Sequence, residues 1–143
     1  MSRVGRQDVV VLDREYDGTS NTLRVARNDL MAALDSYVIE DDIKERAQLV
    51  VSELATNAIQ ASPGAAYGLR VSLAADGSVL MSLTSSTLSD GPPPRNAWGP
   101  AHPIAVRGRG LLIVGKLTDD VDIEQSLPGT IVVTATFRPS AHD

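Results

Sequence analysis

The sequence contains no cysteine and very few aromatic or histidine residues. The absence of cysteine excludes disulfides, thiolate zinc sites and a thiol nucleophile. With only two histidines, a histidine-rich metal site is not expected either. Aromatic residues make up 3% of the 143 residues. We therefore expect a core built from Val, Leu, Ile and Ala.

Long apolar segments are also lacking. No stretch approaches the ~18 consecutive apolar residues of a membrane span, and the N-terminal MSRVGRQD does not resemble a signal peptide. We expect a cytoplasmic protein without membrane contact. The net charge of −5 argues against direct nucleic-acid binding, which needs a basic surface, but it is compatible with a basic protein partner. The length predicts one domain, residues 1–143.

Hydrophobic periodicity and turn residues predict helices mixed with hairpins. The helices are expected at residues 21–37, 42–61 and 111–117. The strands are expected at residues 7–16, 67–75, 78–84, 120–125 and 130–137, with a hairpin turn at Asp76 and Gly77. This order predicts an α+β two-layer sandwich, with helices on one face of a mostly antiparallel, mixed sheet.

Residues 85–107 show no periodicity and contain five of the eight prolines. An irregular segment longer than ~15 residues inside a compact domain is typical of a lid or a binding loop. We therefore expect a loop that covers a ligand.

The helix at residues 42–61 contains the most informative pattern. Its apolar residues form one stripe, and Glu53 and Asn57, four residues apart, lie together beside one edge of it. A carboxylate there can accept a proton, and an amide oxygen can ligate a hard cation such as magnesium. The alternative is two solvated residues of an amphipathic helix, and spacing alone favours that alternative. At the start of this helix, Asp42 and Glu45 fit an acidic form of the capping box.

A second pattern, Arg107-Gly108-Arg109-Gly110-Leu111, comes directly before the short helix. Glycines let the backbone approach an anion, the helix start offers free N–H groups, and the arginines add positive charge. This combination suits a phosphate. A flexible hinge with solvated arginines is the alternative, and this pattern alone does not decide between the two.

Together these motifs resemble those of the GHKL (Bergerat-fold) ATPases and kinases. Residues 53–58, ELATNA, are similar to the E-L-x-x-N-A motif of that superfamily, and residues 108–114, GRGLLIV, resemble its later glycine motif. Gly129 and Thr130 are similar to the G-T pair that completes the nucleotide site. Order and spacing agree over nearly the whole chain. The glycine motif has the form found in small actinobacterial RsbW-like anti-sigma-factor kinases.

The resemblance implies roles for these positions. Glu53 would be the catalytic base that activates a serine or threonine hydroxyl, and Asn57 would hold Mg²⁺ on the phosphates of ATP. Arg107, Gly108, Arg109, Gly110 and Leu111 would surround the phosphates, with residues 85–107 as the lid, and Thr130 would bind near the adenine. The implied partners are a sigma factor and an anti-anti-sigma (STAS) protein, and the implied assembly is a homodimer.

One position departs from the family pattern. Where these proteins carry an aspartate that accepts the adenine amino hydrogen, this chain has Ser85. Asp90 could replace it only if the preceding strand were about five residues longer. A serine accepts a weaker hydrogen bond than a carboxylate. Two functions therefore remain open: an ATP-dependent protein kinase that is also an anti-sigma factor, and a non-catalytic or weakly ATP-binding module that sequesters a sigma factor or another regulatory partner by protein contact alone.

Overall fold

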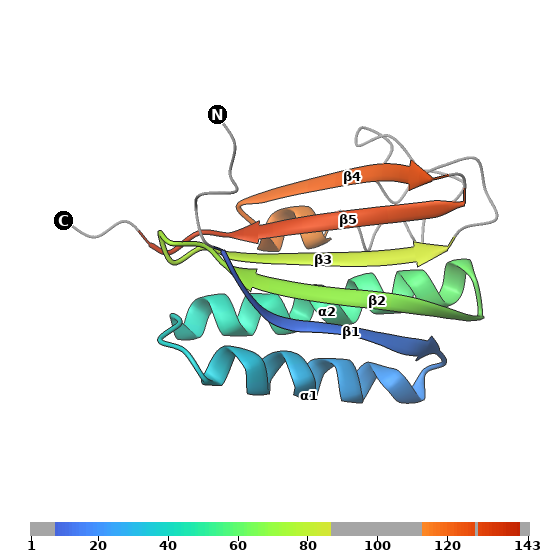
Figure 1. The fold of residues 1–143 in the computed structure, drawn as a ribbon, viewed down its shortest axis with the longest axis horizontal. Coiled ribbons are helices and arrows are strands. Elements are labelled where there is room, and N and C mark those ends of the chain that lie inside the picture. Colours follow the sequence, from blue (N-terminus) through green and yellow to red (C-terminus); the bar gives the residue numbers. More distant parts are fainter. Residues whose placement is uncertain (1–7, 87–112, 128, 141–143) are drawn as a thin grey trace.

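The computed structural model describes residues 8–86, 113–127 and 129–140. The five strands form one open sheet in the order β1-β2-β3-β5-β4, and all four neighbouring pairs are antiparallel (Figure 1). The strands are β1 (Val9–Gly18), β2 (Gly64–Leu73), β3 (Val79–Ser86), β4 (Asp120–Leu127) and β5 (Thr130–Phe137).

Two helices, α1 (Asn21–Asp35) and α2 (Asp41–Ala61), cover one face of the sheet, and a short helix spans residues 113–117. α1 packs on β1, whereas α2 packs on β2, β3 and β5. The central strands alternate buried and exposed residues, as strands with one covered face do. This is the two-layer α+β architecture expected from the sequence. In the described part of the chain, no helix is long and apolar enough to cross a membrane.

The core lies between the sheet and the two helices. As composition predicts, most of its side chains are aliphatic, for example Leu30, Leu34, Ile43 and Val50. The expectation of a purely aliphatic core was wrong, because Tyr16, Tyr67 and Phe137 are also buried. The two tyrosines can be buried because each hydroxyl has a hydrogen-bond partner, Asp29 and Thr22 respectively.

Several boundaries differ from the sequence-based prediction. α1 ends at Asp35 rather than residue 37, because the N–H groups of Ser36 and Tyr37 donate to the carbonyls of Ala33 and Leu34, three residues back, and close the helix. The predicted capping box at Asp42 was wrong: Glu40 is the N-cap residue of α2 and makes no side-chain cap bond. Asp42 pairs with Arg46 instead.

The strand boundaries changed at the ends that meet loops. β2 begins at Gly64 rather than residue 67, since Gly64 pairs with Gly18 of β1. β3 extends to Ser86, because Ser85 and Ser86 pair with Ile131 and Thr130. The prediction that Ser85 belongs to an irregular segment was therefore wrong, since Ser85 and Ser86 are part of β3. The predicted turn is present: Gly77 has a φ of 91°, and the Ser78 N–H donates to the Asp76 carboxylate.

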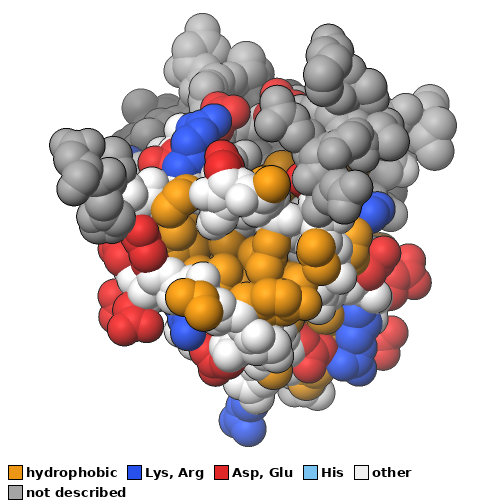
Figure 2. Space-filling model, turned by 60° about the vertical axis from the view of Figure 1, so that its left-hand side comes forward, with side chains coloured by type: hydrophobic (Ala, Val, Ile, Leu, Met, Phe, Trp, Pro, Cys, Tyr) orange, Lys and Arg blue, Asp and Glu red, His pale blue; other side chains and the backbone are white. Residues whose placement is uncertain are grey.

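The two ends of the layered structure differ in character. One end holds the start of β1 and the α1–α2 connection, where Val9, Val10, Tyr37 and Val38 are exposed. Figure 2 brings this end forward and shows hydrophobic side chains gathered across its centre, with charged side chains around them. At the opposite end lie the C-terminus of α2 and the last residues of β3. The residues singled out in the sequence on α2 and β3 lie toward this second end.

Candidate functional site

One edge of α2 carries three polar side chains in a row. At 100° per residue, Arg46, Glu53 and Asn57 lie within about 40° of one another around the helix axis. Arg46, Glu53 and Asn57 are all partly buried, beside a stripe that buries Ile43, Ala47, Val50, Leu54 and Ala58. The opposite edge of α2 faces α1, since Lys44 there bonds Asp35. The predicted placement of Glu53 and Asn57 beside the apolar stripe is confirmed.

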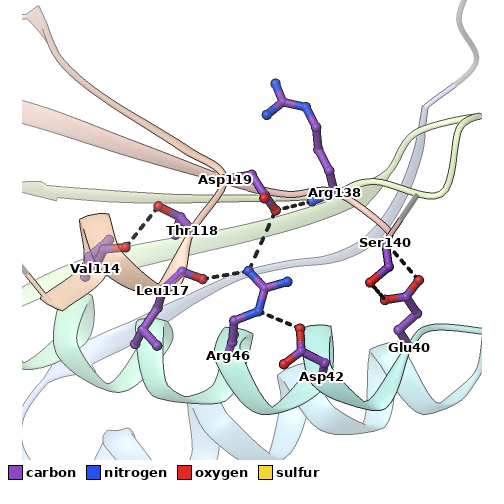
Figure 3. A network of polar contacts seen from close by, with 9 residues as sticks. All are labelled: Glu40, Asp42, Arg46, Val114, Leu117, Thr118, Asp119, Arg138 and Ser140. Carbon is purple, nitrogen blue, oxygen red and sulfur yellow. Dashed lines mark hydrogen bonds and ion pairs between the residues drawn. The ribbon is translucent and has the colours of Figure 1, made fainter. Parts of the chain in front are cut away.

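The polar edge of α2 faces the short helix at residues 113–117. The Arg46 Nη1 donates to the carbonyl oxygen of Leu117 at 2.9 Å. Along the direction in which α2 runs, Figure 3 shows Asp42 first, then Leu117 and then Val114. The short helix, which runs from Val114 to Leu117, is therefore antiparallel to α2. Glu53 lies about 10 Å along α2 from Arg46, and Asn57 about 16 Å, at 1.5 Å per residue. The N-terminal end of the short helix is therefore directed toward the part of α2 that carries Glu53 and Asn57.

Asn57 has an unsatisfied buried donor. Its amide nitrogen is enclosed and has no hydrogen-bond acceptor among the described residues. Leaving such a group without a partner costs about 1–3 kcal/mol, so a ligand that supplies an acceptor gains that much at this position. Rotating the amide by 180° would present its oxygen at the same point, where it could ligate a cation. Glu53 likewise has no hydrogen bond or ion pair to another described residue.

The end of β3 supplies Ser85. Alternation along β3 places Ser85 on the same face as the buried Val79, Met81 and Leu83, which is the face that α2 covers. The Ser62 hydroxyl, just after α2, donates to the carbonyl oxygen of Ser86 at 3.1 Å. This bond ties the C-terminal end of α2 to the end of β3. Ser85 therefore lies on the helix side of the sheet, close in structure to the end of α2.

Thr130 lies on the other face of the sheet from Glu53 and Asn57. It precedes the buried Ile131, so alternation puts its side chain on the outer face of the sheet. There it lines a hollow with Glu15, Gly68, Thr84 and Ser86, and Ser85 at the end of β3 borders the same hollow. A second hollow lies beside it on the same outer face, around Gly68 and Arg70. Neither hollow includes Glu53 or Asn57, which lie on the helix side of the sheet.

Other predicted residues lie outside the described residues. These are Arg107, Gly108, Arg109, Gly110 and Leu111, together with Asp90 and the rest of the expected lid at residues 87–107. The described chain resumes at Ile113, within the predicted short helix, and Val114 of that helix is fully buried. Residues 113–117 are helical, in agreement with the prediction for this segment.

Sequence reasoning missed two polar features. The first is the group of contacts that Arg46 makes, because its partners Leu117 and Asp119 are some 70 residues away in the sequence. The second joins β1 to α1: the Tyr16 hydroxyl and Arg14 both donate to the Asp29 carboxylate, at 2.7 and 2.6 Å. Burial, and then the hydrogen bond to Asp29, raise the pKa of Tyr16 well above its ordinary value. Only the alternation along a strand, which puts Arg14 and Tyr16 on one face, could have hinted at part of this cluster.

Comparisons with known proteins agree with this geometry. A model of the histidine kinase-like ATPase domain matches residues 17–136. The solved structure of the RsbU and RsbW domains of Rv1364c from Mycobacterium tuberculosis is similar to this chain, with a TM-score of 0.62 and 21% identity. The similarity covers 89% of this chain and 32% of that one, so this chain spans about a third of its length. No curated protein matches.

The structural likeness, at this identity, establishes an RsbW-like GHKL fold and nothing beyond the fold. The family match covers most of the chain and includes Glu53, Asn57, Ser85 and Thr130. This chain belongs to the family of histidine kinase-like ATPase domains.

Proposed function

We propose that this protein binds ATP with Mg²⁺ and phosphorylates a serine or threonine of an anti-anti-sigma (STAS) protein, while it inhibits a sigma factor by direct binding. The observation that carries this proposal is the polar edge of α2, where Glu53 and the unsatisfied Asn57 lie toward the start of the 113–117 helix. Membership of the ATPase family supports the nucleotide, and the RsbW-like fold supports partner switching.

The residues present fit a magnesium nucleotide. In the described part of the chain, no three His, Asp or Glu side chains are grouped as a metal site. This suits Mg²⁺ bound largely through phosphates, with one protein oxygen from Asn57. Bound Mg²⁺ would neutralise charge on the phosphates. The glycine motif at residues 108–111 would surround them, and Ser85 would accept a hydrogen bond from the adenine amino group.

Glu53 is suited to the proton transfer. In the proposed reaction, the oxygen of the substrate hydroxyl bonds to the γ-phosphorus of ATP. At the same time the Glu53 carboxylate takes the proton of that hydroxyl. The bond from the γ-phosphorus to the oxygen shared with the β-phosphate breaks, and ADP leaves with that electron pair. Catalysis of this kind depends mainly on positioning and charge stabilisation. A carboxylate without a competing partner among the described residues is free to act as the base.

Replacing the base tests the proposal directly. Glu53→Ala should lower the rate of phosphate transfer to the STAS substrate by about 10²–10⁴-fold, the usual contribution of acid–base catalysis. Glu45→Ala is the matched control, because Glu45 is an exposed carboxylate on the same helix. Transfer of labelled phosphate is measured with both variants, and far-ultraviolet circular dichroism verifies the fold. Equal transfer by Glu53→Ala and Glu45→Ala would refute the assigned role.

Ser85 favours a second candidate function. The hydroxyl stands where the family has a carboxylate, and it lies on the helix side of β3. A module that keeps the fold but binds nucleotide weakly would regulate a sigma factor by protein contact alone. Calorimetry with ATP and Mg²⁺ separates the two functions. Absence of heat at millimolar nucleotide, with sigma-factor binding retained, favours the module over the kinase.

A further inference from the structure

The Arg46 side chain contacts several parts of the fold besides its own helix. Its Nε bonds the Asp42 carboxylate at 2.9 Å, one turn earlier in α2. Its Nη1 bonds the Leu117 carbonyl at 2.9 Å and lies 3.7 Å from the Asp119 carboxylate (Figure 3). The guanidinium also lies 5.7 Å from the centre of the Phe137 ring at the end of β5. One side chain thus joins α2, the 113–117 helix and the sheet.

Asp119 makes the sheet side of this junction rigid. Its carboxylate accepts a hydrogen bond from the Arg138 N–H at 2.6 Å, and its own N–H donates to the Thr136 carbonyl at 2.9 Å. Asp119 is therefore fixed to the end of β5 by both main chain and side chain. Arg46 contacts the short helix at the point where the chain leaves it for β4.

The contact with Leu117 differs in kind from the packing of the short helix. Val114 is fully buried and Leu117 packs against the core, so apolar contacts already hold this helix to the body. Apolar attraction is not directional, however, and permits small rotations and shifts along the helix axis. A hydrogen bond from a cation to a carbonyl at a helix C-terminus has a fixed direction, and it also complements the helix dipole. Arg46 supplies the directional part of the attachment.

The position of Arg46 on α2 gives this attachment a consequence for the site. Arg46 lies on the same edge of α2 as Glu53 and Asn57, and the short helix runs opposite to α2 from that point. A shift of the helix at Leu117 would displace its start relative to both residues.

We propose that Arg46 is a positioning residue of the nucleotide site, which fixes the 113–117 helix against α2 so that the start of this helix is directed toward Glu53 and Asn57. This inference rests on the proposed ATP binding. Arg46 does not need to contact the substrate, because it acts through the Leu117 carbonyl.

The chain contains a closely matched control. Lys44, two residues earlier on α2, also has a mostly covered cationic side chain, 19% exposed against 22% for Arg46. Its partner is Asp35 of α1, on the opposite edge of the helix. Arg46→Met and Lys44→Met each keep an apolar stem and remove one cation. Only Arg46→Met removes the hydrogen bond to the Leu117 carbonyl of the short helix.

Hydrogen exchange tests the attachment without nucleotide. In the free protein, amides of a peptide covering residues 113–119 should exchange about tenfold faster in Arg46→Met than in the wild type, because a hydrogen bond to a charged group is lost. Lys44→Met should leave exchange in this peptide unchanged. Equal exchange rates in Arg46→Met and the wild type would overturn the proposal.

Nucleotide titration tests the consequence. The Kd for ATP with Mg²⁺ should rise about tenfold in Arg46→Met, while the transfer rate at saturating ATP changes by less than about threefold. Arg46→Lys should recover part of the affinity, because an ammonium can donate to the Leu117 carbonyl but cannot bond Asp42 in the same geometry. Lys44→Met should bind as the wild type does. Faster exchange with an unchanged Kd would also overturn the proposal.

The two proposals fail in different ways. If the wild type binds no nucleotide, the proposed kinase function fails and the role of Arg46 in nucleotide binding fails with it. The exchange experiment then still decides whether Arg46 holds the short helix. Urea unfolding of both methionine variants separates a local change at residues 113–119 from a general loss of stability.

Discussion

Asn57 is the residue at which local structure and chemistry are most closely linked. It lies near the C-terminal end of α2, and its neighbours Leu54 and Ala58 are buried. Because the helix holds the amide at the edge of the core, its nitrogen is enclosed without an acceptor among the described residues. A buried polar group that lacks a partner calls for a physical explanation, and a bound phosphate or cation would provide one.

Removing this amide should affect nucleotide binding and not the fold. Asn57→Ala is expected to raise the Kd for ATP about tenfold or more in the presence of Mg²⁺, and to abolish the difference between titrations with and without Mg²⁺. Because the unpaired donor costs about 1–3 kcal/mol in the free protein, its deletion should not lower the free energy of unfolding and should raise it by up to that amount. Gln60→Ala, at an exposed position near the end of α2, is the control. A Mg²⁺ dependence that survives in Asn57→Ala would show that the cation is held elsewhere.

Ser85 and Ser86 offer a second experiment at single residues. Ser85 lies on the helix side of β3, and Ser86, exposed, follows it on the outer face. Ser85→Asp should tighten ATP binding about tenfold, since a charged acceptor makes a hydrogen bond roughly twice as strong as a neutral one. Ser86→Asp adds the same charge one residue away and should not tighten binding. Comparable affinities in the two variants would place the adenine away from Ser85.

At the scale of elements, local signals predicted more than long-range ones. Periodicity predicted α2 and its partly buried Glu53 and Asn57, and the Asp76-Gly77 pair predicted the β2–β3 turn, because both patterns are complete within a few residues. The strand order and the contacts of Arg46 could not be predicted in this way. They join segments far apart in the sequence, and the sequence of neither segment indicates which other segment it will contact.

The pairing of β1 with β2 depends on a glycine whose need was not visible in the sequence. A Cβ added to Gly18 would overlap the backbone carbonyl oxygen of Ala65, whereas a Cβ at Gly68 in the same strand pair would meet only the Glu15 side chain at 4.0 Å. Gly18→Ala should therefore lower the free energy of unfolding by about 1–3 kcal/mol, the usual cost of overpacking. Urea denaturation measures it. Gly68→Ala should change it by less than about 1 kcal/mol, and a similar loss in both variants would contradict this explanation.

At the scale of the whole molecule, two layers are joined by a few buried polar groups as well as by the core. Tyr16 on β1 and Tyr67 on β2 stack with ring centres 5.5 Å apart, and their hydroxyls bond Asp29 and Thr22 of α1. Burial is the main cause that raises the pKa of both hydroxyls. The attachment of α1 to the sheet is consequently linked to the protonation of these two tyrosines.

This linkage predicts a loss of stability at high pH. In the unfolded chain a tyrosine loses its proton near pH ~10, whereas in the folded protein Tyr16 retains it to higher pH. Above pH ~10 the unfolded state therefore binds fewer protons, and the free energy of unfolding falls by up to ~1.4 kcal/mol per pH unit for each such tyrosine. Tyr16→Phe should lower stability at neutral pH by about 1 kcal/mol through loss of the bond to Asp29, and should make the decline above pH ~10 shallower. Urea denaturation between about pH 7 and about pH 11 measures both effects. Tyr37→Phe, which removes an exposed phenol, is the control. Parallel declines in the wild type and Tyr16→Phe would show that the alkaline transition arises at other groups.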